Sequence, residues 1–147
     1  METEFRRYQE KDYIDLLEMI FSLYREDPEG KPIDEEKIKR TIDEFWKNPD
    51  KVKIYMFQTG DKNIGYAILV YFWSNEYGGD IITIDELYVN DACRGRGIAT
   101  EFFSFVERME NKAALQLETT PSNQKAFNYY KRLGFVPSEN MHLIRQD

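Results

Sequence analysis

The sequence contains little cysteine, no long apolar run and a shortage of positive charge. Its one cysteine, Cys93, cannot form an internal disulfide and lacks the paired spacing of a zinc site, which favours a reducing compartment. No window approaches the roughly 18 consecutive apolar residues that a membrane span requires. Residues 1–10 also lack the apolar stretch of a signal peptide. The sequence therefore predicts a cytoplasmic protein with no membrane partner.

Positive charge is outnumbered, with 20 basic residues against 27 acidic ones and a net charge of −7 at pH 7. An acidic surface repels the phosphate backbone of nucleic acids, so no nucleic-acid partner is expected. The same negative surface attracts cationic small molecules. In many proteins of this size, however, such a surface serves only to keep the protein soluble.

The length and the amino-acid composition suit one folded domain spanning residues 1–147. The chain is 41% hydrophobic and 15% aromatic, which is enough for a sizeable core, and it has no internal repeat or dividing linker. Apolar residues at helical spacing predict helices over 13–24, 34–46, 98–109 and 123–133, with Asp34 as an N-terminal cap and Gly134 as a C-terminal one. Strand-like runs occur near Phe5 and over 52–59, 64–72, 81–89 and 113–119, with a weaker final strand from Phe135 onward that includes 141–144. The predicted fold is a mixed α/β domain in the order β-α-α-β-β-β-α-β-α-β.

A glycine-containing loop follows the strand at 81–89 and opens the next helix. It reads Arg94-Gly95-Arg96-Gly97-Ile98-Ala99. Glycines allow successive backbone N–H groups to converge on an anion, and a helix beginning near Gly97 directs the positive end of its dipole there. Two adjacent arginines suit a pyrophosphate better than a single phosphate. Taken alone, the pattern fits an anion site and an ordinary glycine turn equally well.

Two other phosphate-binding patterns do not fit this loop. A dinucleotide-binding fingerprint requires glycine or alanine at the position of Thr100, and its first strand would not come so late in the chain. A Walker loop requires Gly-Lys-Ser or Gly-Lys-Thr, which is absent.

Three segments together resemble the GNAT superfamily of acetyl-CoA-dependent N-acetyltransferases. The strand Asp85-Glu86-Leu87-Tyr88-Val89 and the loop after it match the acyl-CoA motif of that family, with Arg94, Gly97 and Ala99 at the motif positions. A downstream motif is matched by Asn123, Ala126, Tyr130, Gly134 and Phe135. The expected order of elements agrees over the whole chain.

The resemblance implies a splayed central pair of strands that holds acetyl-CoA as a co-substrate, with no metal. It also implies direct transfer of the acetyl group to an amine, without an acyl-enzyme. The residues it assigns to the coenzyme are Leu87, Tyr88, Val89, Arg94, Gly95, Arg96, Gly97, Ile98, Ala99, Thr100, Asn123, Ala126 and Tyr130. Asn123 is equally suited to cap the helix that follows it.

By its position in the motif, Tyr130 is the expected general acid, which hydrogen-bonds to the leaving sulfur. The adjacent Tyr129 is expected to be a packed aromatic residue. Asp85 and Glu86 are the candidate bases, and strand alternation predicts that they point to opposite faces. Glu86 is favoured over Asp85, and deprotonation by solvent water is the alternative. Cys93 and His142 are each isolated and receive no catalytic role.

In this family the first two helices and a hairpin loop build the acceptor pocket. Here those segments contain Asp27, Glu29, Asp34, Glu35 and Glu36, together with Trp73, Ser74, Asn75, Glu76 and Tyr77. Carboxylates and aromatic faces suit a cationic small-molecule amine. The alternatives are a protein N-terminus or lysine as acceptor, and a non-catalytic acyl-CoA-binding regulatory module. Family members are often homodimers, but the sequence pattern shows no self-complementary patch.

Overall fold

The computed structural model describes residues 2–27 and 31–147. Pro28, Glu29 and Gly30, which were expected to end the first helix and to contribute one acidic group to the acceptor side, lie outside the described residues. The described elements are β1 (Thr3–Arg7), α1 (Tyr13–Glu26), α2 (Glu35–Lys47), β2 (Val52–Thr59), β3 (Lys62–Ser74), β4 (Gly79–Val89), α3 (Ile98–Met109), β5 (Ala114–Leu117) and α4 (Gln124–Arg132), with short 3-10 turns at Glu10–Asp12 and Asp91–Cys93.

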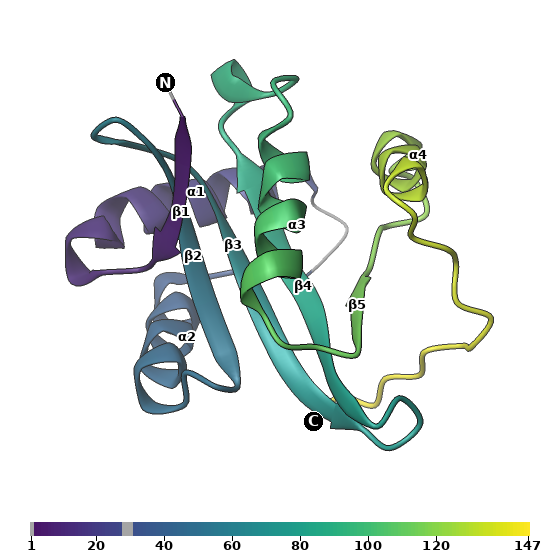
Figure 1. Cartoon of the computed structure of the whole chain (residues 1–147). Coiled ribbons are helices and arrows are strands. Elements are labelled where there is room, and N and C mark those ends of the chain that lie inside the picture. Colours follow the sequence, from purple (N-terminus) through teal and green to yellow (C-terminus); the bar gives the residue numbers. More distant parts are fainter. Residues whose placement is uncertain (1, 28–30) are drawn as a thin grey trace.

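The five strands form one mixed sheet in the order β1-β2-β3-β4-β5 (Figure 1). All neighbours are antiparallel except β4 and β5, which are parallel and connected through α3. The predicted mixed α/β single-domain fold is confirmed. The predicted helices, and the strands up to residue 117, lie at the expected places.

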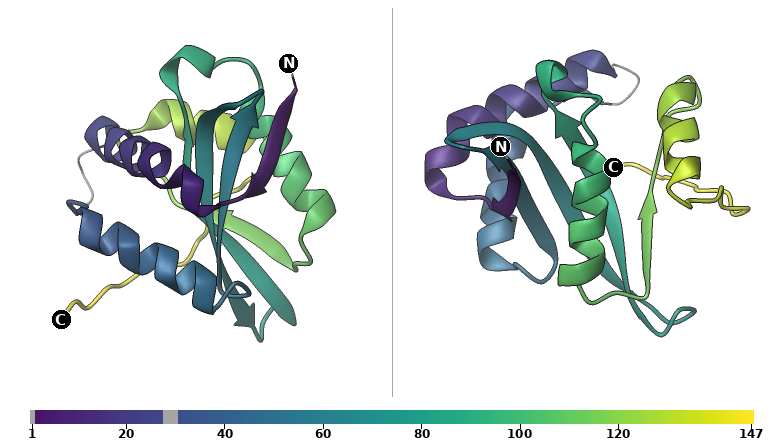
Figure 2. Two further views of the ribbon diagram at one scale, coloured as in Figure 1. Left: turned by 90° about the vertical axis from the view of Figure 1, so that its left-hand side faces the viewer. Right: turned by 45° about the horizontal axis from the view of Figure 1, so that its top comes forward.

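Helices cover both faces of the sheet, so its central strands are buried on both sides. Helices α1 and α2 pack on one face against alternate residues such as Ile54 and Met56. Helix α3 packs on the other face against Tyr55 and Phe57. Figure 2 shows α1 and α2 on the opposite side of the sheet from α3. This is why β2 and β3 are rich in apolar residues without strict alternation.

The predicted final strand is absent. Residues 135–147 form neither helix nor strand. Val136, Met141, Leu143 and Ile144 are between 80% and 88% exposed. Strand pairing needs a neighbouring edge, and this segment runs clear of β5 instead of along it (Figure 2).

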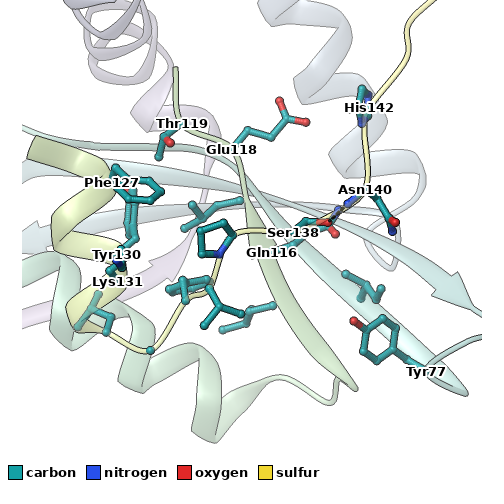
Figure 3. A pocket seen from close by; sticks show the side chains of 18 of the residues that line it. Tyr77, Gln116, Glu118, Thr119, Phe127, Tyr130, Lys131, Ser138, Asn140 and His142 are labelled. Carbon is teal, nitrogen blue, oxygen red and sulfur yellow. Dashed lines mark hydrogen bonds between the residues drawn. The ribbon is translucent and has the colours of Figure 1, made fainter. Parts of the chain in front are cut away.

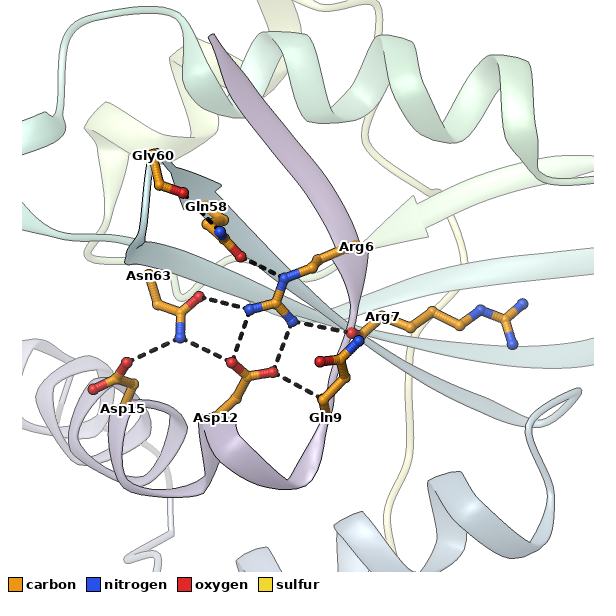
Figure 4. Close-up of polar contacts among 8 residues, drawn as sticks. All are labelled: Arg6, Arg7, Gln9, Asp12, Asp15, Gln58, Gly60 and Asn63. Carbon is orange, nitrogen blue, oxygen red and sulfur yellow. Dashed lines mark hydrogen bonds and ion pairs between the residues drawn. The ribbon is translucent and has the colours of Figure 1, made fainter. Parts of the chain in front are cut away.

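A buried ion pair joins β1 to the start of α1 (Figure 4). The Arg6 guanidinium donates two hydrogen bonds of 2.8 Å to the carboxylate of Asp12, whose side chain is 2% exposed. Asn63 and the backbone N–H of Gln9 also donate to this carboxylate. Burial alone would raise the pKa of Asp12, but these hydrogen bonds outweigh it and lower the pKa.

Replacing Asp12 with alanine should lower the free energy of unfolding by about 3 kcal/mol, because the partly buried Arg6 would lose its counter-charge and Asn63 and the N–H of Gln9 would lose their acceptor. Urea unfolding followed by circular dichroism measures this change. Because the pKa of Asp12 is lower in the folded state, its contribution is complete above the ordinary carboxylate range and is lost as the pH falls through the lowered value. The exposed Glu10 in the same turn is the control, since Glu10→Ala should change stability by less than about 0.5 kcal/mol. Equal effects of the two variants would contradict a stabilising role for the pair.

Candidate functional site

Strands β4 and β5 separate part of the way along their length. They pair from Ile81 and Ala114 to Ile84 and Leu117, and no pairing continues beyond that point within the described chain. Figure 2 shows β5 turning away from β4. The predicted splayed pair of strands is therefore present, and it leaves one side of the β4 backbone free for a ligand.

The free side belongs to the segment that the sequence assigned to the coenzyme. Leu87, Tyr88 and Val89 remain paired with β3 on their other side, opposite Ala67, Tyr66 and Gly65. Their outward edge faces the gap between the strands. Strands β3 and β4 pack closely at this point because residue 65 is glycine. A Cβ atom on Gly65 would lie 2.4 Å from the carbonyl oxygen of Tyr88.

A β-bulge interrupts β4 at Asp85. Ile68 pairs with Glu86 and Leu69 with Ile84, so Asp85 is an extra residue without a partner on β3. The bulge breaks the alternation on which the opposite-face prediction rested. The opposite-face assignment of Asp85 and Glu86 therefore stays a prediction.

Glu86 is held by two tyrosines. Tyr24 of α1 donates to Oε2 over 2.6 Å, and Tyr66 of β3 donates to Oε1 over 2.8 Å. Desolvation raises the pKa of Glu86, the two phenol hydrogen bonds oppose that rise, and the nearby charge of Asp85 adds to it. Glu86 has no ion pair with any cation of the described residues.

Asp85 keeps contact with solvent at the bulge. Its pKa is raised, first by desolvation of the carboxylate and then by the charge of Glu118, which follows β5 across the gap. Three carboxylates, those of Asp85, Glu86 and Glu118, therefore influence this part of the splay. By contrast, the acidic residues at the start of α2 are engaged locally: Asp34 caps the helix, Glu35 accepts from Tyr13 and Glu36 pairs with Arg40.

The loop after β4 has the backbone geometry that its glycines predict. Gly95 and Gly97 have φ values of 78° and 77°, in the left-handed region that disfavours other residues. Helix α3 begins at Ile98, and its first hydrogen bond runs from the N–H of Glu101 to the carbonyl of Gly97. The N–H groups of the three residues before Glu101 are therefore without intrahelical acceptors, at the positive end of the helix dipole.

The two arginines of the loop differ in position. The Arg94 guanidinium donates to the carbonyl of Val89 and forms a bidentate contact of 2.8 and 2.9 Å with Glu26 at the end of α1. Arg94 therefore lies beside the loop as expected, and a carboxylate of another helix also holds its guanidinium group. Arg96 is exposed, and no ion pair involves it among the described residues.

Helix α4 carries the second motif. The side chain of Asn123 accepts from the N–H of Ala126 over 3.1 Å, which confirms that it caps the helix. Gly134 ends the helix with φ of 98°, and the N–H of Phe135 bonds back to the carbonyl of Tyr130. Both helix ends are thus fixed by residues that belong to the motif.

The neighbouring tyrosines of α4 have different surroundings. Tyr130 packs edge-on against Phe103 and Phe135, and burial raises its pKa to about 12. Tyr129 was expected only to pack, but its hydroxyl lies 2.8 Å from the hydroxyl of Thr100 in the first turn of α3. The hydroxyl of Tyr129 therefore connects α4 to the first turn of α3, and the ring of Tyr130 lies beside it, with 5.3 Å between the two ring centroids.

Tyr130 lines a cavity of about 880 Å³ bounded by β5, α4, the tip of the β3–β4 hairpin and residues 134–142 (Figure 3). Ser74, Glu76 and Tyr77, which the sequence placed on the acceptor side, contribute to this cavity at the beginning of β4. Trp73 beside them is 68% exposed. The hairpin residues therefore lie at the beginning of β4, whereas Glu86 lies near its end.

The remaining candidates have simple environments. Cys93 is half-buried against the core on the α3 face, and His142 is exposed in the C-terminal segment. In the part of the chain that the structure describes, no group of three or more metal-ligating side chains is found. None of the helices described has the length and apolar character of a membrane span.

Sequence reasoning missed four residues of this region: Tyr24, Tyr66, Glu26 and Glu118. Tyr24 was assigned to the apolar face of its helix, and Tyr66 lay unnoticed in a buried strand. Their spacing carries no sign that their hydroxyl groups converge on Glu86. Glu26 and Glu118 lie far in sequence from the residues they influence, so only the fold reveals them.

Comparison with known proteins gives one family and one fold. The model described as the acetyltransferase (GNAT) family matches residues 17–135, which is more than half of the chain. No curated protein matches the sequence.

Several solved structures are similar in fold. A possible acetyltransferase from Clostridium difficile 630 is 20% identical with a TM-score of 0.84, covering 100% of this chain and 99% of that one. AAC(6')-Iy in complex with the bisubstrate analog CoA-S-monomethyl-acetylneamine is 16% identical with a TM-score of 0.80, over 100% and 99%. A ribosomal-protein-alanine N-acetyltransferase from Brucella melitensis biovar Abortus 2308 is 13% identical with a TM-score of 0.76, over 99% and 100%. At these identities the likeness concerns the fold.

Proposed function

Because the chain belongs to the GNAT acetyltransferase family, we propose that it transfers the acetyl group of acetyl-CoA directly to a primary amine, with small cationic amines as the preferred acceptors. The observation that carries this proposal is the free edge of Leu87–Val89 in the splay, next to the N-terminus of α3. An extended ligand with a pyrophosphate at one end and a thioester at the other fits that arrangement.

Several groups without internal partners suit such a ligand. The N–H groups at the start of α3 and in the Gly95–Gly97 loop would bind the pyrophosphate. The N–H groups of Leu87 and Val89, which point into the splay, would bind the pantetheine arm and the thioester carbonyl. The hydroxyl of Thr120, just beyond β5, is buried and has no hydrogen-bond partner among the described residues. When bound, acetyl-CoA supplies the activated acetyl group.

The reaction forms a nitrogen–carbon bond and breaks the carbon–sulfur bond, so the amine must lose a proton and the departing thiolate must gain one or be stabilised. Backbone N–H groups of β4 stabilise the negative charge on the carbonyl oxygen. The phenol of Tyr130 donates a hydrogen bond to the sulfur. Glu86, which two tyrosines hold in place, accepts the amine proton through water, with Asp85 as the alternative.

The preference for cationic acceptors rests on the charge around the splay. The charge of Glu118 acts on Asp85 and that of Asp85 acts on Glu86, and none of the three carboxylates has an ion pair among the described residues. A positively charged acceptor would relieve this concentration of negative charge.

Turnover of acetyl-CoA with a panel of amines, read by release of free thiol, tests the proposal. Cationic amines should be acetylated, and acetyl-CoA alone should raise the melting temperature. Exclusive use of peptide N-termini or protein lysines would replace the small-molecule acceptor by a protein. Binding of acetyl-CoA without turnover over the whole panel would indicate a regulatory module, and absence of binding would refute the coenzyme site.

Tyr24→Phe tests whether Glu86 acts as the base. Loss of the 2.6 Å hydrogen bond removes an effect that lowers the pKa of Glu86, so that pKa should rise. The acidic limb of the pH–rate profile should move upward by about one pH unit. Tyr13→Phe is the matched control, because Tyr13 of the same helix makes an equally short hydrogen bond to the exposed Glu35. An unshifted profile in Tyr24→Phe, together with an unchanged profile in Glu86→Gln, would remove Glu86 from the role.

A further inference from the structure

The last turn of α1 ends beside the glycine loop that opens α3. Glu26 is the final residue of this helix, and both oxygens of its carboxylate accept from one nitrogen of the Arg94 guanidinium, over 2.8 and 2.9 Å. Arg94 directly precedes Gly95 in the loop. A cation that borders the proposed pyrophosphate site therefore has a close carboxylate partner within the chain itself.

Other contacts hold the Arg94 guanidinium independently of Glu26. Its Nε donates to the carbonyl of Val89 over 2.8 Å, and its Cζ lies 5.3 Å from the centroid of the Tyr88 ring. Asp91 adds a longer ion pair of 3.6 Å. Because Tyr88 and Val89 are the last residues of β4, they fix the guanidinium at the end of that strand. Removing the charge of Glu26 should therefore leave the guanidinium in place without its closest counter-charge.

Glu26 is in turn held independently of Arg94. Tyr24 in the same turn donates to Glu86 over 2.6 Å, which ties the end of α1 to β4. Exposed ion pairs usually contribute little, because two long and flexible side chains must be ordered to form them. Here the two side chains are only 44% and 40% exposed, and both belong to segments that other contacts already fix. The carboxylate therefore offsets the positive charge of Arg94 beside the loop.

We propose that Glu26 lowers the affinity of the loop for coenzyme A by neutralising Arg94, and so allows the product to leave. The inference rests on the proposed function, in which the loop binds the pyrophosphate. The pyrophosphate is the same in acetyl-CoA, in the transition state and in the product coenzyme A. Attraction to it therefore adds nothing to the rate of the chemical step and slows the departure of the product. Arg96, which is exposed and has no ion pair among the described residues, remains available to attract the pyrophosphate.

Calorimetry of coenzyme A binding to the whole chain measures this effect. Glu26→Gln keeps the length of the side chain and removes its charge, so the dissociation constant for coenzyme A should fall about threefold to fivefold. The difference should shrink as the salt concentration rises. Glu18→Gln is the matched control. It removes the same charge from an exposed position about two turns earlier in α1, and it should change the dissociation constant by less than about 1.5-fold.

An unchanged or raised dissociation constant in Glu26→Gln would overturn the proposal. If the wild-type chain bound no coenzyme A at all, the proposed function itself would fail. If the wild type bound it and Glu26→Gln bound it no more tightly, only the role of Glu26 would fail. Release of bound coenzyme A, followed by displacement with excess acetyl-CoA, should be slower in Glu26→Gln. An unchanged release rate would overturn the role in product departure.

A double-variant cycle tests whether the effect passes through Arg94. In an Arg94→Gln background, Glu26→Gln should change the dissociation constant for coenzyme A by less than about 1.5-fold, because no guanidinium is left to neutralise. An equally large increase in affinity in that background would show that Glu26 repels the pyrophosphate directly, and would overturn the assignment.

Discussion

Replacing Tyr130 with phenylalanine is expected to lower kcat by about 10²–10⁴-fold, with little change in the affinity for acetyl-CoA. The substitution removes one oxygen atom and retains the ring that packs against Phe103 and Phe135. The fold should therefore be preserved while the departing sulfur loses its hydrogen-bond donor. Steady-state kinetics together with calorimetry of acetyl-CoA binding separate the two effects.

The pKa of Tyr130 indicates how the hydroxyl acts. With a pKa of about 12 the phenol stays protonated throughout the neutral range, so its titration should not shape the pH–rate profile there. A thiol has an ordinary pKa of about 8.5, so complete proton transfer from this phenol to the thiolate is uphill. In the proposed mechanism Tyr130 would therefore act mainly by donating a hydrogen bond as charge develops on the sulfur.

Tyr129→Phe is the control for this experiment. It alters the neighbouring residue by the same single atom and removes the contact with Thr100. A modest loss of acetyl-CoA affinity is expected, with kcat close to that of the wild type. If Tyr130→Phe keeps full turnover, or if Tyr129→Phe loses turnover instead, the assignment of the donor is wrong.

Replacing Gly97 with valine should abolish measurable binding of acetyl-CoA at concentrations that saturate the wild type, a loss of at least about a hundredfold. A Cβ atom at Gly97 meets no neighbour within 4 Å, so the harm does not come from a clash. The loss comes from the backbone angle φ of 77° at this position, which is sterically unfavourable for a β-branched residue. The backbone would rotate, and the N–H groups proposed to bind the pyrophosphate would turn with it. Calorimetry or a thermal-shift titration with acetyl-CoA gives the affinity.

Gly78→Val separates backbone strain from ligand binding. Gly78 also has a positive φ, 66°, and open space around it, but it lies at the tip of the β3–β4 hairpin. Both variants should be destabilised by about 1–2 kcal/mol. Only Gly97→Val should lose the coenzyme. Equal affinity for acetyl-CoA in the two variants would show that the loop does not bind the pyrophosphate.

Much of the fold could be predicted because it depends on local patterns. Asp34, Asn123 and Gly134 mark helix ends through side-chain caps and a left-handed residue, which act over a few positions of the chain. The glycines of the loop likewise fix its conformation locally. Predictions of this kind need only the nearest residues.

The details that escaped prediction depend on contacts distant in sequence. The bulge at Asp85 arises from the register between β3 and β4, which no periodicity specifies. Arg94 is turned toward Glu26, 68 residues earlier in the chain. The final strand was inferred from its composition, but a strand also requires a free edge within reach. Composition indicates that a segment is able to pair, whereas the fold determines where its partner is.

The arrangement of the sheet also bears on the order in which the molecule assembles. Strands β2, β3 and β4 are joined by short turns and can form early from local contacts, whereas β5 must wait for the crossover through α3 and gains only four paired residues. The pairing of β4 with β5 is thus expected to form last and to be the least protected from hydrogen exchange in the sheet. The proposed coenzyme site adjoins this pairing, so bound acetyl-CoA would be expected to slow hydrogen exchange there.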